Sequence, residues 1–228
     1  MLSVSDTQLL QLDGWTLRLR SPRQQPARLL LMLHGWTGDE RSMWVFAPHT
    51  VPDYWIVAPR APFPTQPSGY SWRPLIERRG WPRLEDMQPT AEKLQGLMDA
   101  LAEHLGVSPS APVDLMGFSQ GAAMTAVFLL LYPERVGKAA LLSGFIPQGC
   151  EALLSPGRLD GKAIFLAHGR QDEMVPYEWA VQAAEALRVA GAVVTFCDEE
   201  VGHKVGAACA RDLERFFAVA GNGRRPEQ

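Results

Sequence analysis

The chain has only three cysteines in 228 residues, Cys150, Cys197 and Cys209. None of them forms a Cys-x-x-Cys pair or a spacing typical of zinc ligands. An odd number of cysteines is typical of free thiols in a reducing compartment, so we expect free thiols and a cytoplasmic protein. We interpret each cysteine as a small residue in the core or at its margin.

Long apolar runs and an excess of one charge are also missing. The longest apolar stretch, residues 126–131, is far shorter than the ~20 residues that a membrane helix needs, so we expect no integral membrane association. Residues 1–20 lack the basic start and apolar run of a signal peptide. The net charge of −3 gives no reason to expect nucleic acid or an anionic membrane as a partner. The polar residues 221–228 predict a flexible tail.

What the sequence does contain is the composition of an ordinary globular protein. Hydrophobic residues make up 46% of the chain and charged residues 21%, a balance that argues against disorder. A chain of 228 residues can bury a sizeable hydrophobic core, and no internal repeat or linker divides it. We therefore predict a single domain over residues 1–220.

Short apolar runs alternate with amphipathic helical patterns along the chain. The strands that we expect are Trp15–Leu19, Leu29–Leu33, Trp55–Ala58, Val113–Met116, Ala139–Leu142, Ala163–Ala167 and Val193–Phe196. The helices that we expect are Ala91–Leu105, one that follows Ser119, Tyr177–Ala190 and Val205–Ala220. This alternation predicts an α/β fold with a mainly parallel central sheet and helices on both faces.

Residues 61–85 interrupt this alternation. They contain five prolines, which argue against any regular element. Phe63, Tyr70, Trp72 and Trp81 supply a large apolar surface, and a loop this long inside a compact domain is usually functional. Two interpretations stay open: the loop forms a wall of a substrate pocket, or it covers an exposed edge of the sheet. The same surface could also support a homodimer.

The segment Val113–Gly121, with the sequence VDLMGFSQG, reads as a buried strand that ends in Gly-x-Ser-x-Gly and leads directly into a helix. A serine at such a sharp turn takes a strained backbone conformation that exposes its hydroxyl over the end of the sheet. Side chains two positions before and after Ser119 would collide across this turn, and Gly117 and Gly121 remove those collisions. Ser119 is therefore our candidate nucleophile.

A serine hydroxyl needs a base to remove its proton, and the base needs a third group to orient it. In doubly wound hydrolases these groups occur in the order Ser, Asp, His, each after a later strand. Asp172 follows the expected strand 163–167, and His203 follows the expected strand 193–196. We therefore predict that Asp172 is the acid and His203 the base, at the same edge of the sheet as Ser119.

Other side chains compete for these roles. His168 follows a strand directly, but its neighbour Gly169 indicates a tight structural turn. The rival acids near the expected position are Glu173, Glu199 and Glu200. The residues that we interpret as solvated, structural or pocket-lining are His49, His104 and Ser143.

Attack on a carbonyl group creates an oxyanion, and each donor aimed at it contributes on the order of 3 kcal/mol. One expected donor is the backbone N–H of Gln120, at the start of the helix after Ser119. The other is the backbone N–H of Trp36 in the loop 34–38, where Gly35 lets the backbone approach the reacting carbon. We expect the indole of Trp36 to line the pocket.

With these residues the chain resembles the phospholipase/carboxylesterase family of α/β-hydrolases, which includes the acyl-protein thioesterases. The matching segments are Leu33-His34-Gly35 with Gly38-Asp39, Ala58-Pro59 with Ala61-Pro62, Gly69-Tyr70-Ser71-Trp72, Gly117–Gly121, Leu142-Ser143-Gly144, His168-Gly169 with Asp172 and Val175-Pro176, and Gly202-His203. The resemblance implies a serine esterase, without a cofactor or metal ion, that uses Ser119, Asp172 and His203. Trp36 and Gln120 would supply the oxyanion donors.

The chain departs from the family pattern at two places. Ala122 stands where the family often has a second glycine, a small change that should tighten helix packing. The segment 73–83 is rich in arginine and does not match a standard family lid, which leaves the acyl chain length and the leaving group open. Our candidates for the substrate pocket are Trp72, Trp81, Phe118, Met174 and Val175.

We predict a carboxylesterase that cleaves small-molecule esters of small to medium acyl chains through an acyl-enzyme. The nearest alternative is an acyl-thioesterase or lysophospholipase that acts on longer chains. From a different class, a non-catalytic binding protein with this fold would not need a nucleophile, a base and an acid together.

Overall fold

The computed structural model describes residues 7–23, 27–49, 53–75 and 80–218. Its strands are β1 (Gln8–Leu12), β2 (Trp15–Arg20), β3 (Arg28–Leu33), β4 (Tyr54–Pro59), β5 (Phe63–Pro64), β6 (Tyr70–Ser71), β7 (Val113–Phe118), β8 (Val136–Leu142), β9 (Ala163–Gly169) and β10 (Val193–Glu199). Its helices are α1 (Leu84–Leu105), α2 (Gln120–Leu131), α3 (Tyr177–Val189) and α4 (Ala207–Ala218), with short 3₁₀ helices η2 (Ser42–His49), η3 (Pro133–Arg135) and η4 (Glu151–Leu153). All seven strands expected from the sequence are present.

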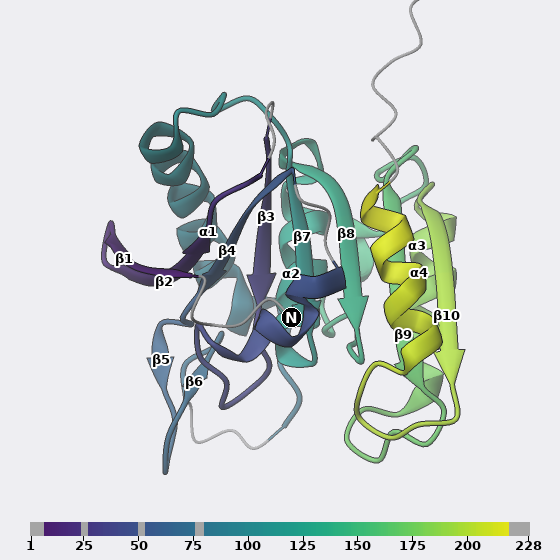
Figure 1. The fold of residues 1–228 in the computed structure, drawn as a ribbon. Coiled ribbons are helices and arrows are strands. Elements are labelled where there is room, and N and C mark those ends of the chain that lie inside the picture. Colours follow the sequence, from purple (N-terminus) through teal and green to yellow (C-terminus); the bar gives the residue numbers. More distant parts are fainter. Residues whose placement is uncertain (1–6, 24–26, 50–52, 76–79, 219–228) are drawn as a thin grey trace, which may run out of the picture.

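Eight of these strands form one sheet in the order β1-β2-β4-β3-β7-β8-β9-β10 (Figure 1). Pairing from β4 to β10 is parallel, whereas β1 and β2 add an antiparallel edge. Strand β3 is buried along almost its whole length, because a central parallel strand is covered on both faces. Strand β2 instead alternates buried and partly exposed residues, as expected of an antiparallel strand near the sheet edge.

Helices cover both faces of the sheet. In Figure 1, α1, α2 and α3 lie behind it, and η2 and α4 lie in front. Each face has its own hydrophobic cluster, one joined by α1, α2 and α3 and the other by η2 and α4. Helix α2 is buried on nearly all sides, which explains why its sequence is apolar without a polar stripe. The expected α/β class, with a mainly parallel sheet and helices on both faces, is confirmed.

Three details differ from the sequence-based expectation. Strand β1 was not predicted; it pairs with β2 across a tight turn at Asp13 and Gly14, with φ of 46° and 77°. The prolines of the loop 61–85 do not forbid regular structure, because β5 and β6 pair as a short antiparallel ribbon. Helix α1 begins at Leu84, seven residues before the expected start and inside that loop.

The early start of α1 has a local cause. Asp86 accepts a hydrogen bond of 2.9 Å from the backbone N–H of Arg83, which caps the new helix end. Glu85 and Asp86 also place negative charge where the helix dipole is positive. The helix accommodates Pro89 within its second turn. Helix α4 ends at Ala218, and the predicted continuation to residue 220 and the tail 221–228 lie outside the described residues.

The expectation of free thiols is wrong for two of the three cysteines. Cys197 in β10 and Cys209 in α4 form a disulfide. Cys150 is free and buried, and burial raises the pKa of its thiol to about 12. An odd cysteine count does not reveal which residues the fold brings together, and these two lie twelve positions apart in the chain.

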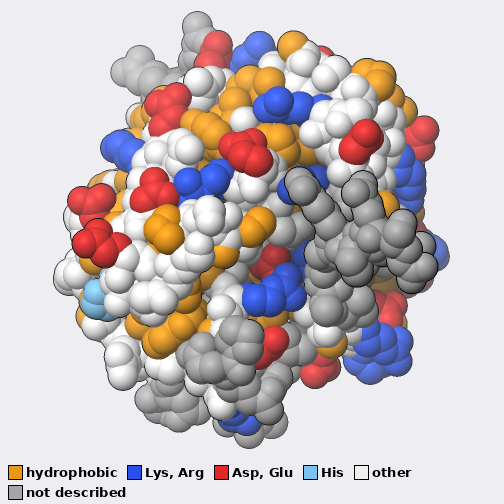
Figure 2. All heavy atoms as spheres, turned by 90° about the horizontal axis from the view of Figure 1, so that it is seen from above, with side chains coloured by type: hydrophobic (Ala, Val, Ile, Leu, Met, Phe, Trp, Pro, Cys, Tyr) orange, Lys and Arg blue, Asp and Glu red, His pale blue; other side chains and the backbone are white. Residues whose placement is uncertain are grey.

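The face at the amino ends of the parallel strands carries mixed charge. Figure 2 shows this face, with acidic and basic side chains interspersed among apolar ones. Among the helices of the described residues, none has the length and apolar character that a bilayer span requires.

Candidate functional site

The turn between β7 and α2 has the expected strain. Ser119 has φ 54° and ψ −116°, outside the regions that suit an L-residue. A Cβ atom on Gly117 would lie 2.1 Å from the carbonyl oxygen of Gly121, and one on Gly121 would lie 2.1 Å from the carbonyl oxygen of Leu33. The predicted collision across the turn is therefore confirmed for Gly117, whereas Gly121 is required by the close approach of the end of β3.

Asp172 and His203 meet at the same edge of the sheet. Asp172 lies in the loop after β9 and His203 in the loop after β10, and the His203 Nδ1–H donates to Asp172 Oδ2 over 2.7 Å. The other carboxylate oxygen accepts the backbone N–H groups of Met174 and Val175, at 2.8 and 2.9 Å. These bonds fix the acid and leave Nε2 as the basic nitrogen of His203.

The imidazole of His203 lies next to the turn that carries Ser119. Its ring centroid is 5.0 Å from that of Phe118, the residue before the serine. Within the described part of the chain, no hydrogen bond joins the Ser119 hydroxyl to His203. Such contacts are often long in free enzymes and shorten when substrate binds. The structure thus brings the three predicted residues to one edge with the acid–base pair already formed.

The rivals have other contacts. His168 is buried, and its Nε2 lies 3.0 Å from the Val175 carbonyl oxygen and 3.4 Å from Asp172 Oδ2, so it supports the acid loop from below. Glu199 accepts the backbone N–H groups at the start of α4. Glu200 pairs with Arg170, and Glu173 is exposed. Ser143 is buried at the end of β8 with φ 47°.

The loop 34–38 lies against Ser119, as the oxyanion prediction requires. A Cβ atom on Gly35 would lie 3.3 Å from Phe118 Cδ1 and 3.4 Å from the Ser119 Cβ, so this loop packs directly on the serine turn. Neither the Trp36 N–H nor the Gln120 N–H donates to another group of the described chain. Within the described residues, these two donors without a partner therefore lie on the residue after Ser119 and in the loop that packs on the serine turn. The Trp36 indole is 57% exposed.

Three side chains hold this loop and the helix start in place. His34 accepts the Ala61 N–H at Nε2 over 3.0 Å, so its Nδ1–H donates to the Gly35 carbonyl at 2.8 Å. The Trp72 indole N–H donates to the His34 carbonyl at 2.6 Å, and its backbone N–H donates to the Gln120 side chain at 2.9 Å. We call His34, Trp72 and the Gln120 side chain the oxyanion support.

Backbone hydrogen bonds also join the loop 61–85 to the loop 34–38. Thr37 N–H donates to the Tyr70 carbonyl at 3.0 Å, and Tyr70 N–H donates to the Gly38 carbonyl at 2.9 Å. A Cβ on Gly69 would lie 1.9 Å from the Thr37 carbonyl oxygen, so the two segments approach as closely as glycine allows. Part of this proline-rich loop therefore packs against the loop 34–38 and holds it in place.

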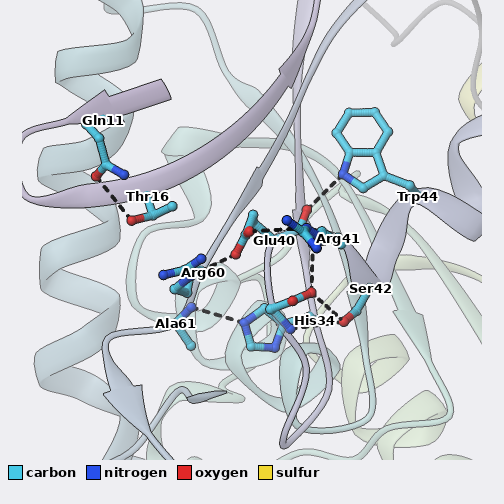
Figure 3. A network of polar contacts seen from close by, with 10 residues as sticks. Gln11, Thr16, His34, Glu40, Arg41, Ser42, Trp44, Arg60 and Ala61 are labelled. Atoms are coloured by element: carbon cyan, nitrogen blue, oxygen red, sulfur yellow. Dashed lines mark hydrogen bonds and ion pairs between the residues drawn. The ribbon is translucent and has the colours of Figure 1, made fainter. Parts of the chain in front are cut away.

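Burial determines the charge state of His34 in the oxyanion support. It lowers the pKa of His34 from 6.5 to about 4, so the ring is neutral at physiological pH and Nε2 can accept a hydrogen bond. Figure 3 shows His34 beside the Glu40–Arg60 ion pair of 2.7 Å. Burial alone would raise the pKa of Glu40, but the Arg60 guanidinium lowers it on balance and keeps the carboxylate charged.

The five pocket candidates lie in different environments. Trp72 is fully buried in the oxyanion support, and Val175 is buried in the acid loop. Met174 is exposed, and Phe118 packs on His203. Trp81 lines a cavity of about 310 Å³.

Three aromatic rings form one end of this cavity. Trp81, Phe145 and Trp179 pack edge to face, with ring centroids 4.6 to 5.6 Å apart. Apart from Pro82, the remaining lining comes from the segment after β8 and from α3, with Ile146, Leu154 and Ala183 among its members. The segment after β8 passes the backbone of the serine turn, since a Cβ on Gly144 would lie 2.3 Å from the Ala122 Cβ and 3.3 Å from the Ser119 carbonyl oxygen. Phe145 and Trp179 were missed because each is an unremarkable apolar residue in the sequence.

Comparisons with known proteins agree with this picture. The model of the phospholipase/carboxylesterase family matches residues 16–219. Esterase YpfH of Escherichia coli is 31% identical over 198 residues, which cover 82% of this chain and 80% of that protein. Carboxylesterase SOBER1 of Arabidopsis thaliana is 35% identical over 107 residues, 46% of this chain and 47% of the relative, so that match spans about half of each.

A solved structure supports the fold. The carboxylesterase from Mesorhizobium loti superimposes with a TM-score of 0.78 at 22% identity, covering 93% of this chain and 99% of that one. The resemblance expected from the sequence is confirmed. The chain belongs to the phospholipase/carboxylesterase family and has the α/β-hydrolase fold.

Proposed function

We propose that this hydrolase cleaves carboxylic esters of small to medium acyl groups through an acyl-enzyme on Ser119. The observation that carries the proposal is the 2.7 Å bond between His203 and Asp172 at the sheet edge where the strained Ser119 turn lies. Serine, carboxylate and imidazole in this chain order perform acyl transfer in many enzymes of this fold.

In this mechanism His203 Nε2 takes the proton of the Ser119 hydroxyl as the oxygen attacks the ester carbonyl. Asp172 orients the ring and stabilises the imidazolium cation. The N–H groups of Trp36 and Gln120 stabilise the tetrahedral oxyanion. His203 then gives its proton to the leaving alcohol, and the same base activates a water molecule that releases the acid.

The cavity beside Phe145 supports the chain-length part of the proposal. Its volume of about 310 Å³ lies at the lower end of the range of ligand pockets, roughly 300–1,000 Å³. Each buried methylene stabilises the complex by about 0.8 kcal/mol, or about fourfold in kcat/KM. Activity should therefore rise with acyl length until this cavity is filled, and then stop rising.

A substitution at the nucleophile tests the chemistry. We expect Ser119→Ala to fold normally but to lose hydrolysis of p-nitrophenyl butyrate and labelling by a fluorophosphonate probe. Turnover that persists in this variant would refute the assignment of Ser119. A matched set of thioesters, assayed with the wild-type protein, separates ester from thioester preference.

A second pair of variants tests the acyl site. Trp179→Ala enlarges the cavity wall, and we expect it to flatten the rise of kcat/KM from acetyl to hexanoyl esters while acetyl turnover changes little. Val181→Ala, on the same helix but exposed and outside the cavity lining, serves as the control. An unchanged length profile in Trp179→Ala would place the acyl group elsewhere.

A further inference from the structure

Strand β10 ends in Asp198 and Glu199, and a third acidic residue, Glu200, follows directly, three residues before His203. Their side chains have different partners. The Glu199 carboxylate accepts the N–H groups of Ala208 and Cys209, at 3.3 and 2.9 Å, and so caps the start of α4. Asp198 and Glu200 contact Arg170 instead.

Arg170 belongs to the loop that carries the acid, two residues before Asp172. Its guanidinium donates to both oxygens of Asp198, at 3.1 and 2.9 Å, and to Glu200 at 2.9 Å. The Tyr177 hydroxyl also donates to Asp198. Through its planar fork, Arg170 binds two carboxylates from the other loop at once, which an ammonium group cannot do with the same geometry.

The backbones of the two loops also lie side by side beyond the ends of β9 and β10. Arg170 N–H donates to the Glu199 carbonyl at 2.8 Å, and Gln171 N–H donates to the Val201 carbonyl at 3.1 Å. A Cβ on Gly169 would lie 2.1 Å from the Val201 carbonyl oxygen. These contacts therefore fix the path of the chain after β10 next to the loop that carries Asp172.

We propose that Arg170 is a positioning residue that holds the His203 loop against the Asp172 loop. This inference rests on the proposed function of His203 and Asp172. Asp198 and Glu200 project to the same side of the strand end and repel each other, so without the guanidinium between them the loop relaxes away from Asp172. The side chain of Arg170 is 48% exposed, so its ion pairs add little stability and act on the placement of His203 instead.

Two substitutions of Arg170 test this role. Arg170→Met keeps the apolar stem and removes the fork, and we expect kcat for p-nitrophenyl butyrate to fall about tenfold while KM stays within twofold. Arg170→Lys, which neutralises one carboxylate at a time, should recover part of the loss, to about threefold below wild type. Arg215→Met removes an exposed ion pair with Asp212 on α4 and should leave kcat unchanged.

A second measurement needs no substrate. In ¹⁵N-histidine-labelled protein, the Nδ1 proton of His203 that is bonded to Asp172 should give a downfield signal, which we expect to broaden or disappear in Arg170→Met and to persist in Arg215→Met. Thermal unfolding midpoints of both variants should stay close to that of the wild type. Wild-type kcat in Arg170→Met together with an unchanged signal would overturn the positioning role. Loss of the proposed function would show differently, as a wild-type protein without turnover or fluorophosphonate labelling.

Discussion

The two sides of the candidate site are held by different kinds of interaction. On the oxyanion side, the buried side chains of His34, Trp72 and Gln120 form neutral hydrogen bonds. On the base side, the loop of His203 is held by the exposed ion pairs of Arg170 and by the disulfide that closes residues 197–209. One side depends on burial, and the other on charge and a covalent bond.

This difference fits the task of each side. Oxyanion donors work best when they are fixed before the reaction, and buried neutral hydrogen bonds give such rigidity without the desolvation cost of ions. His203 must exchange protons with substrate and water, so its loop lies near the surface, where hydrogen bonds compete with solvent. Ion pairs and a cross-link stabilise a surface loop that a small hydrophobic contact would not hold.

The largest effect on kcat should come from removing a side chain of the buried hydrogen bonds on the oxyanion side. We expect His34→Ala to lower kcat about 100-fold, because the Gly35 carbonyl and the Ala61 N–H lose their partner and the Trp36 donor shifts. Steady-state kinetics well below the unfolding temperature measure this effect. His104→Ala removes an exposed histidine of α1 and is the control. Near-normal kcat in His34→Ala would show that the loop 34–38 keeps its conformation without the His34 side chain.

The covalent bond on the base side should contribute about 3 kcal/mol to the free energy of unfolding, since it closes a loop of 12 residues. The double variant Cys197→Ser, Cys209→Ser should lose this amount in urea denaturation. Thiol titration of the unfolded wild-type protein without reductant should find one free thiol, that of Cys150. Three free thiols would contradict the cross-link.

Low pH should reduce the free energy of unfolding, because His34 is buried in its neutral form. The pKa of His34 is lowered to about 4 in the folded protein, so the unfolded chain binds a proton first as the pH falls below 6.5. Stability from the neutral ring is fully present above pH 6.5 and is lost between pH 6.5 and about 4, by about 2.5 kcal/mol at pH 4.5. Urea unfolding at pH 7 and 4.5 should show this loss in the wild type, over and above any change in His34→Asn. Equal changes in both proteins would exclude His34 as the source.

Salt should have the smallest effect, and only on the base side. At about 1 M NaCl the Debye length falls to about 3 Å, which screens the exposed ion pairs of Arg170. We expect kcat of the wild type to fall by less than about twofold, and kcat of Arg170→Met to be insensitive to the same salt. A salt effect of equal size in both proteins would show that the ion pairs of Arg170 are not its source.

Much of this architecture could be read from local patterns. The need for Gly117 in the strained turn at Ser119 follows from the sequence, because its steric conflict is with Gly121, only four positions away, whereas the conflict at Gly121 is with Leu33 on another strand. The placement of Asp172 and His203 follows from the strands before them, since parallel strands end at one edge of the sheet. The start of α1 at Leu84 was missed, because prolines concealed a helix cap made by Asp86.

The sequence by itself determined the fold class, the order of the candidate nucleophile, acid and base, and the need for glycine at Gly117, because each depends on periodicity or on neighbours along the chain. Only the tertiary structure decided that His34 is a neutral support, that Arg170 binds Asp198 and Glu200, and that Cys197 meets Cys209. Burial and the pairing of distant charges arise when separate segments pack together, and no local pattern encodes which segments meet.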